Sequence, residues 1–176
     1  MCSGAETEYE AVHHNPEGTM TVRVNGAPAP EARDPDISLV DFLREQCSAV
    51  SCRPACRVGR CGGCMVVLNG EAVNACLIRM WRFDGTDADI VTLEGIGHYP
   101  EGRILQEEMI AHTAFQCGYC APGFLMAALP FLLGNNPQIS DIPHVLTGNI
   151  CRCTGYRSIV HALEQALIRL QKSRTC

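Results

Sequence analysis

The chain has 176 residues, a hydrophobic content of 47% and a formal net charge of -5. This composition permits a buried core and argues against wholesale disorder, and the acidic balance argues against a surface that binds nucleic acid or anionic lipid. The longest apolar run, Phe124 to Leu133, is shorter than the roughly 20 apolar residues that a membrane-spanning helix needs, so we expect no membrane insertion.

The N-terminal residues Met1–Glu6 lack the positive charge and the apolar stretch of an export signal. We therefore expect a cytoplasmic, reducing setting, in which patterned cysteines serve as metal ligands more often than as disulfides. The 12 cysteines are an even number, as in a disulfide scaffold. Such scaffolds are usually short and poor in apolar residues, however, whereas this chain has long apolar stretches.

For the first part of the chain, the sequence predicts a tail followed by a hairpin. Residues 1–18 show no sustained period and are expected to form a tail, with His13 and His14 solvated rather than bound to a metal. Residues 19–24 alternate between apolar and polar side chains, which predicts a half-buried strand. Asn25-Gly26 is a strong hairpin signal, and the two prolines in residues 27–33 predict a short second strand at an edge.

Residues 36–45 are predicted to form a helix. Ser38 is placed to cap it, and the apolar residues Leu39, Phe42 and Leu43 recur on one face.

The next elements are predicted to be strands. A buried strand over Met65–Leu68, a turn at Asn69-Gly70 and a return strand over residues 71–78 place Cys76 on a strand. Residues 90–93 are predicted as the last strand. This element order is that of a β-grasp.

The pattern becomes helical after a turn-rich segment at 95–102, which we interpret as a linker. Helices are predicted over 103–116, from Pro122 to about Leu133, over 140–147, and after Cys153. The apolar stripe of the last helix comprises Ile159, Ala162, Leu163, Ala166, Leu167 and Leu170. Four helices on short loops predict a small bundle.

One quartet of cysteines has the spacing C-x4-C-x2-C, followed by eleven residues and a further cysteine. Its members are Cys56, Cys61, Cys64 and Cys76. This is the spacing with which plant-type ferredoxins bind a [2Fe-2S] cluster. Glycines between the ligands let the backbone approach the cluster sulfurs. The spacing therefore predicts that these four thiolates bind one [2Fe-2S] cluster.

A second quartet lies downstream and consists of Cys117, Cys120, Cys151 and Cys153. Each of its two pairs precedes a predicted helix start, where the helix dipole favours the negative charge of a cluster. A C-x2-C pair with a distant C-x-C pair is also compatible with zinc, although C-x-C is less usual there. The residues of this quartet alone leave iron–sulfur and zinc open.

Two motifs carry a family resemblance: Q-C-G-Y-C-A-P-G at residues 116–123 and G-N-I-C-R-C-T-G-Y at residues 148–156. Together with the first quartet they resemble the iron–sulfur small subunit of the molybdenum hydroxylases, which include xanthine oxidase, aldehyde oxidoreductase and carbon monoxide dehydrogenase. The resemblance implies an α+β chain. A plant-type ferredoxin-like β-grasp domain is expected over 19–94, a linker over 95–102, and a four-helix-bundle [2Fe-2S] domain over 103–172.

The resemblance also implies an electron-transfer subunit without catalytic residues of its own. In this family, electrons pass singly from a molybdenum–pterin cofactor in a large subunit, through two [2Fe-2S] clusters, to FAD in a medium subunit or to another acceptor. Gln116 and Cys153 match positions that lie near the pterin. The alternatives are an independent two-cluster ferredoxin and, from another class, a structural zinc-binding module.

The segment Cys47–Ala55 departs from the family pattern while it keeps the same length. Cys47 and Ala55 stand where leucine and glycine are usual, so this segment is expected to alter the exposure, potential or partner contact of the cluster. Cys47 is interpreted as a small buried hydrophobe. The role of Cys52 stays open, and one alternative is that Cys52 replaces Cys56 as a ligand of the first cluster. Cys2 and Cys176 are interpreted as incidental thiols.

Overall fold

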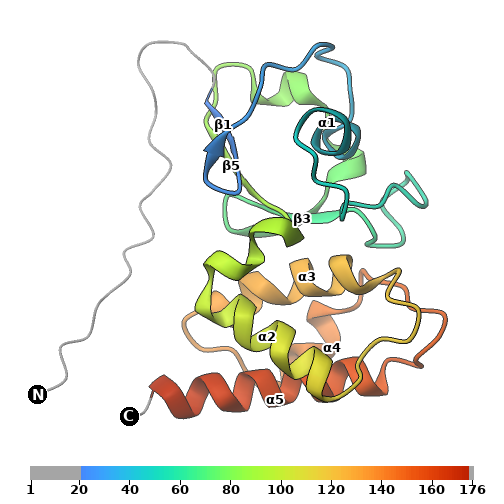
Figure 1. Ribbon diagram of the computed structural model, residues 1–176, viewed down its shortest axis with the longest axis vertical. Helices are drawn as coiled ribbons and strands as arrows, with labels where there is room; N and C mark the ends of the chain where they lie inside the picture. Colours follow the sequence, from blue (N-terminus) through green and yellow to red (C-terminus); the bar gives the residue numbers. More distant parts are fainter. Residues whose placement is uncertain (1–20, 175–176) are drawn as a thin grey trace, which may run out of the picture.

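The computed structural model describes residues 21–174, and Figure 1 places the sheet above a layer of helices. The predicted tail at residues 1–18, with its histidines, lies outside the described residues, as do Cys2 and Cys176. Residues 21–174 form a mixed fold of helices and one sheet. None of the helices in this range is long and apolar enough to cross a membrane.

Within residues 21–174, five strands pair in the order β2-β1-β5-β3-β4. They are β1 (Val22–Val24), β2 (Ala27–Pro28), β3 (Met65–Leu68), β4 (Glu71–Asn74) and β5 (Ala88–Val91). Strands β1 and β5 run parallel, and the other pairs are antiparallel. Strand β2 lies at the edge, as its proline predicts, because a proline cannot donate a hydrogen bond to a neighbouring strand.

Both predicted hairpin turns are confirmed. Asn25 and Gly26 have φ angles of 54° and 83°, a left-handed conformation that asparagine and glycine adopt readily. The side chain of Asn25 also accepts a hydrogen bond of 2.8 Å from the backbone N–H of Thr92. The first hairpin is therefore tied to the chain that leaves β5.

Helix α1 (Leu39–Gln46) begins at the predicted cap. The hydroxyl of Ser38 accepts a hydrogen bond of 3.3 Å from the backbone N–H of Asp41 and donates one of 2.6 Å to its carboxylate. Leu39, Phe42 and Leu43 are fully buried. They pack in a hydrophobic cluster with residues of the sheet. This packing holds α1 in place, and with it the start of the loop that follows.

The prediction that Cys76 lies on a strand is wrong. Strand β4 ends at Asn74, and Cys76 lies in the 3₁₀ helix η1 (Ala75–Leu77). The reason is that Asn74 pairs with Met65, the first residue of β3, so the ladder ends there. The next backbone N–H, that of Ala75, bonds instead to the carbonyl of Cys64 at 3.3 Å. This turn brings Cys76 toward Cys64.

Three predicted boundaries also differ from the structure. Strand β5 begins two residues earlier than predicted, because its first residues pair with β1. The segment 95–102 is helical: it contains most of the 3₁₀ helix η3 (Leu93–His98) and the first residues of helix α2 (Pro100–Ala111). Pro100 sits in the first turn of α2, where its missing N–H costs nothing. Helix α2 ends at Ala111 rather than Gln116, and Thr113 has a φ of 47°.

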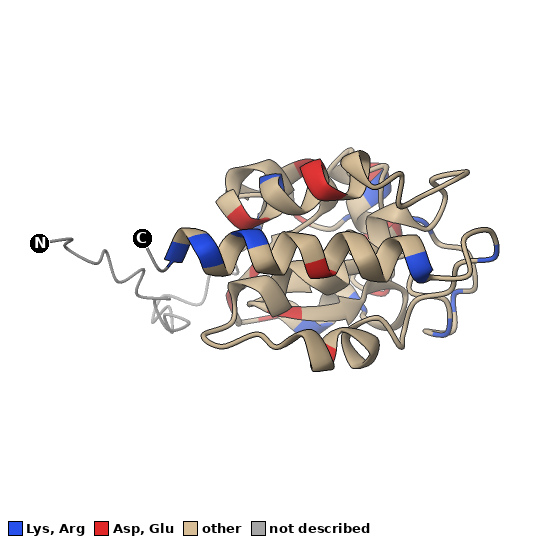
Figure 2. Cartoon of the chain, turned by 90° about the horizontal axis from the view of Figure 1, so that it is seen from below, with Lys and Arg blue, Asp and Glu red and all other residues tan. Residues whose placement is uncertain are grey.

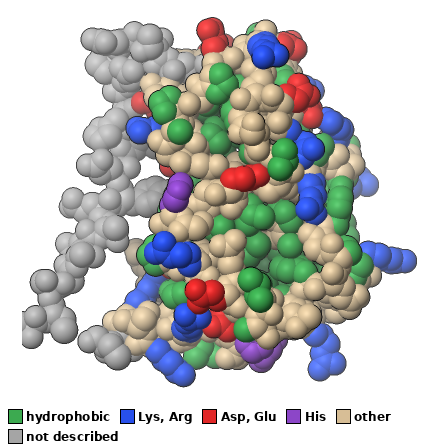
Figure 3. Space-filling model, in the orientation of Figure 1, with side chains coloured by type: hydrophobic (Ala, Val, Ile, Leu, Met, Phe, Trp, Pro, Cys, Tyr) green, Lys and Arg blue, Asp and Glu red, His purple; other side chains and the backbone are tan. Residues whose placement is uncertain are grey.

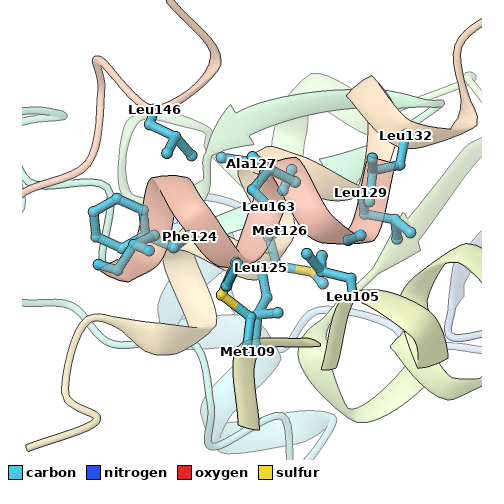
Figure 4. Packing of buried hydrophobic residues seen from close by; sticks show 14 of the residues in the cluster. Leu105, Met109, Phe124, Leu125, Met126, Ala127, Leu129, Leu132, Leu146 and Leu163 are labelled. Atoms are coloured by element: carbon cyan, nitrogen blue, oxygen red, sulfur yellow. The ribbon is translucent and has the colours of Figure 1, made fainter. Parts of the chain in front are cut away.

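The remaining helices follow the prediction closely. They are α3 (Ala121–Leu133), α4 (Ile142–Val145), which the 3₁₀ helix η4 (Ile139–Asp141) precedes, and α5 (Arg157–Arg174). The 3₁₀ helix η2 (Met80–Phe83) was not predicted. The predicted apolar stripe of α5 is buried throughout. Helix α3 is buried on most sides, and Figure 4 shows its side chains packed among those of α2 and α5.

The described residues pack in two hydrophobic clusters that meet at the sheet. Val66 of β3 belongs to the cluster around α1, whereas its neighbours Met65 and Val67 belong to the cluster around α3. This division follows from the alternation of side chains along a strand. Strand β3 and helix α3 therefore lie against each other, as Figure 1 shows. Cys64 directly precedes β3, and Cys120 directly precedes α3.

Candidate metal centres

The first quartet of cysteines meets as two pairs. On the loop between α1 and β3, the side chain of Cys61 lies close enough to that of Cys56 to change the pKa of its thiol. The side chain of Cys76, in η1, acts in the same way on the thiol of Cys64, just before β3. Cys64 is the most deeply buried of the four, with 2% of its surface exposed. The fold therefore brings the predicted quartet together as two pairs of neighbouring cysteines.

The thiols of the first quartet differ in how easily they ionise. The backbone N–H groups of Val58 and Arg60 hydrogen-bond the sulfur of Cys56, the latter at 3.3 Å, and lower the pKa of this thiol to about 6. Burial raises the pKa of Cys64 to about 12. Because metals bind the thiolate, Cys56 is largely ready to bind near neutral pH, whereas metal binding at Cys64 has to displace the proton of its thiol.

The loop of the first quartet is shaped by a left-handed glycine and an ion pair. Gly62 has a φ of 70°, and a Cβ there would lie 2.3 Å from the side-chain nitrogen of Asn149, so only glycine fits. Arg57 pairs with Asp41 of α1 through two hydrogen bonds of 2.7 and 2.9 Å. The pair fastens the loop beside Cys56 to the capped start of α1.

The second quartet also meets as two pairs. The sulfurs of Cys117 and Cys153 lie 3.7 Å apart, and Cys120 and Cys151 hydrogen-bond through their side chains. Cys120 is the N-cap residue of α3. The sulfur of Cys151 lies 3.1 Å from the hydroxyl of Thr154. The loops before α3 and before α5 therefore face each other with two thiols each.

The second quartet repeats the electrostatic contrast of the first. The backbone N–H of Tyr119 lowers the pKa of Cys117, whereas burial raises the pKa of Cys120 to about 12. Although burial acts against it, hydrogen bonds from Thr154 hold the pKa of Cys151 below its ordinary value. Each quartet thus contains a thiol stabilised as thiolate by N–H or O–H groups and a second thiol, the buried Cys64 or the half-buried Cys120, whose removal from water disfavours the thiolate.

The paired arrangement suits a two-iron cluster. A structural zinc site needs four ligands around one centre. A [2Fe-2S] cluster bound by four cysteines takes two thiolates on each iron, which is the pattern of two facing pairs.

The other residues named from the sequence have varied surroundings. Gln116 is exposed beside Cys117, and Cys153 is exposed as well. Cys47 is only half-buried, so its interpretation as a buried hydrophobe is correct in part; it packs at the margin of the cluster around α1. Cys52 is 2% exposed within the same cluster, and burial raises the pKa of its thiol to about 12.

The structure adds direct links between the two loops that the sequence did not indicate. The backbone N–H of Ile150 donates to the carbonyl of Cys61 at 3.0 Å, and the side-chain nitrogen of Asn149 donates to the carbonyl of Gly62 at 3.3 Å. The guanidinium of Arg53 donates to the carbonyl of Gly118 at 3.0 Å. These contacts join residues separated by 65 or more positions, so no local pattern predicts them.

The distribution of charged residues along the sequence also indicates the site, but less specifically than the cysteine spacing. Residues 46–70 and 142–163, which carry five of the candidate ligands, contain no Asp or Glu. They do contain the arginines Arg53, Arg57, Arg60, Arg152 and Arg157. Figure 2 shows basic residues on the loops at the end of the molecule where α5 begins. Cations at this end suit the negative charge of four thiolates and their cluster.

Comparisons with known proteins agree with this chemistry. A family model described as "[2Fe-2S] binding domain" matches residues 92–164. The chain is 36% identical over 153 residues to the nicotinate dehydrogenase small FeS subunit of Eubacterium barkeri, covering 86% of this chain and 96% of that protein. It is 38% identical over 148 residues to the nicotine 6-hydroxylase small subunit of Paenarthrobacter nicotinovorans, covering 82% of this chain and 87% of that protein.

Solved structures with the same fold include an aldehyde oxidoreductase from Desulfovibrio desulfuricans, with a TM-score of 0.78 and 39% identity. The match covers 86% of this chain and 17% of that one. Quinoline 2-oxidoreductase from Pseudomonas putida 86 matches with a TM-score of 0.76 and 30% identity over 87% of this chain and 95% of the other. The chain therefore spans nearly the whole of some relatives and about a sixth of the aldehyde oxidoreductase.

Proposed function

Because this chain belongs to the iron–sulfur subunits of the molybdenum hydroxylase family, we propose that it binds two [2Fe-2S] clusters and conducts electrons between a molybdenum–pterin centre and a second acceptor. Its role is electron transfer as a non-catalytic subunit of an oxidoreductase. The observation that carries the two-cluster proposal is the meeting of eight cysteines as four facing pairs.

The proposed ligands of the first cluster are Cys56, Cys61, Cys64 and Cys76, and those of the second are Cys117, Cys120, Cys151 and Cys153. Within each set, the facing pairs suggest which two thiolates share an iron. When bound, such a cluster accepts and releases one electron at a time. The chain supplies the thiolates, the backbone N–H groups that stabilise their charge, and the glycine at position 62 that leaves room for close packing.

We propose a division into a β-grasp domain over 19–94 and a four-helix-bundle domain over 103–172, joined through 95–102. The two hydrophobic clusters support it, since one surrounds α1 and the other surrounds α3 and α5. The parallel neighbours β1 and β5 suit a β-grasp. The helical character of 95–102 makes this junction a packed connection rather than a loose linker.

The proposed partner on one side is a large subunit that holds the molybdenum cofactor. Gln116 and Cys153 are exposed beside the second quartet, where they are available to the pterin of such a partner. On the other side, the proposed acceptor is FAD in a medium subunit, reached through the first cluster. The proposed setting is the cytoplasm. The substrate of the complex is determined by the large subunit and not by this chain.

The proposed route inside the chain runs from the second quartet to the first. The hydrogen bond from Ile150 to Cys61 supports it, because Ile150 is bonded directly to Cys151. One hydrogen bond and a few covalent bonds then connect a thiolate of each quartet. Asn149, the residue before Ile150, is buried at 3% exposure and packs beside this junction.

The test is metal and sulfide analysis of the purified chain, followed by EPR after reduction with dithionite. We expect four irons and four labile sulfides per chain, roughly, and two distinct [2Fe-2S] signals, since each cluster carries two of each. Bound zinc without labile sulfide would contradict the proposal. Purification of the native complex separates a subunit from an independent ferredoxin: we expect a molybdenum-containing large chain to accompany this one, and isolation of this chain alone would favour the ferredoxin.

A further inference from the structure

The backbone of Arg53 is part of the loop that carries the first quartet. Its N–H donates a hydrogen bond of 3.0 Å to the carbonyl of Gly63, the residue between Gly62 and Cys64. Arg53 also lies in the segment Cys47–Ala55, which departs from the family pattern. The position of its Cα is therefore determined by the turn that carries two candidate ligands of the first cluster.

The side chain of Arg53 reaches the other quartet. Its Nη1 donates to the carbonyls of Gly118, at 3.0 Å, and of Tyr119, and its guanidinium carbon lies 4.9 Å from the centre of the Tyr119 ring. Gly118 and Tyr119 are the two residues between Cys117 and Cys120. None of the ion pairs recorded within residues 21–174 includes Arg53. Its charge is therefore directed at the two carbonyls of this loop.

One peptide group connects Arg53 to a candidate ligand. The carbonyl of Gly118 accepts from Arg53, and the N–H of the same peptide unit, which belongs to Tyr119, lies close enough to the sulfur of Cys117 to lower the pKa of this thiol. A cation at the carbonyl end polarises the peptide and strengthens the hydrogen bond at its N–H end. Hydrogen bonds in series reinforce one another in this way.

We propose that Arg53, although carried by the loop of the first quartet, is a positioning residue for the second cluster: it holds the Gly118–Tyr119 peptide with its N–H on Cys117 and so favours the reduced state of that cluster. The inference rests on the proposed function, because it takes Cys117 as a ligand. Reduction adds one electron and therefore one negative charge. A cation and an N–H donor near a ligand sulfur stabilise that charge, which raises the reduction potential.

Arginine is suited to this position because its planar guanidinium stacks on an aromatic ring while it donates to neighbouring oxygens. Lysine keeps the charge but loses the stacked, planar group. The conservative variant Arg53→Lys and the neutral variant Arg53→Gln therefore separate the effect of charge from that of geometry. Arg60→Gln is the matched control, since Arg60 is an exposed arginine of the same loop.

The experiment is an EPR-monitored redox titration of the full chain with its clusters, in which the second signal is identified as the one lost in Cys117→Ser. At a fixed potential, Arg53→Gln is expected to lower the reduced-to-oxidised ratio of the second cluster at least tenfold, about 59 mV for one electron. Arg53→Lys is expected to lower it by less, and Arg60→Gln to leave it within twofold. A change within twofold in Arg53→Gln, or an equal shift in Arg60→Gln, overturns the proposal.

Hydrogen exchange of the Tyr119 amide gives a second readout on the same protein. Arg53→Gln is expected to exchange at least tenfold faster there, and unchanged exchange overturns the positioning role. If the wild-type chain gives no iron–sulfur signal, the proposed function fails, and the exchange result still decides whether Arg53 holds the Gly118–Tyr119 peptide. If Arg53→Gln does not fold, Arg53→Lys decides: unchanged potential and unchanged exchange overturn the proposal, and a fall in potential with faster exchange supports it.

Discussion

The backbone N–H of Ile150 donates a hydrogen bond of 3.0 Å to the carbonyl oxygen of Cys61. Ile150 immediately precedes Cys151, so this bond joins the two cysteine quartets by their backbones. The contact of Asn149 with Gly62 and that of Arg53 with Gly118 lie in the same two loops. Because these three contacts join the two loops directly, they determine the distance between the quartets.

The two quartets are expected to bind their clusters independently. Cys56→Ser should remove or perturb one of the two EPR signals of the reduced chain and leave the other recognisable, and Cys117→Ser should do the reverse. The physical reason is that serine is a poorer ligand for iron than a thiolate, while the other quartet keeps all four sulfurs. Spectra of the two variants, recorded with iron content, check this prediction. Two intact signals in either variant would show that the altered cysteine is not a ligand.

Gly62→Ala is expected to lower the free energy of unfolding by roughly 2 kcal/mol or more, because strain at a left-handed φ and a steric clash add together. Its new Cβ would lie 2.3 Å from the Asn149 side chain. Gly85→Ala is the matched control: Gly85 has a φ of 71°, but a Cβ there meets nothing within 4 Å. Denaturant unfolding of both variants, in the same metal state, measures the difference. Equal losses in the two would mean that the contact with Asn149 contributes nothing.

Thr154→Val is expected to lower the potential of the second cluster, whereas Thr154→Ser should preserve it. The backbone N–H of Tyr156 donates to the Thr154 hydroxyl at 3.1 Å, which leaves the hydroxyl proton free to donate to the sulfur of Cys151, 3.1 Å away. Without that donor the reduced, more negative state is less stabilised. We expect a change of roughly tenfold in the reduced-to-oxidised ratio, about 59 mV for one electron, by redox titration. A serine variant that shifts as far as the valine variant would argue against the hydroxyl.

Asp41→Asn is expected to reduce stability at neutral pH but not in acid. Arg57 holds the pKa of the Asp41 carboxyl below its ordinary value, with help from Ser38. A carboxyl whose pKa is lower in the folded chain contributes stability above its unfolded pKa, about 3.9, and loses this contribution as the pH falls through the folded value. Wild type and Asp41→Asn should therefore differ at pH 7 and converge toward pH 3 in urea unfolding, with both in the same metal state.

The effect of Asp41→Asn is expected to be small, since the Arg57 side chain of the pair is 56% exposed to solvent. It should shrink further at high salt, because mobile ions screen such pairs. A difference that persists undiminished at pH 3 would assign the stability to the Ser38 cap or to packing instead of to the charge of Asp41.

Local signals in the sequence were sufficient for much of the fold. Asn25-Gly26 predicted its turn, Ser38 predicted the start of α1, and the apolar stripe from Ile159 to Leu170 predicted the buried face of α5. These features depend on residues within a few positions of one another. The cysteine spacing likewise indicated which residues gather, because ligand spacing is itself a local property.

Tertiary packing decided the features that local signals do not contain. The sequence predicted a strand at Cys76, but the ladder between β3 and β4 ended first and the chain turned toward Cys64. The pairing of Cys117 with Cys153, and the reach of Arg53 from the first loop to the second, depend on how β3 packs on α3. The sequence by itself thus determined the chemistry of the candidate ligands. Only the packed structure determined which thiols face each other, since those contacts join residues far apart in the chain.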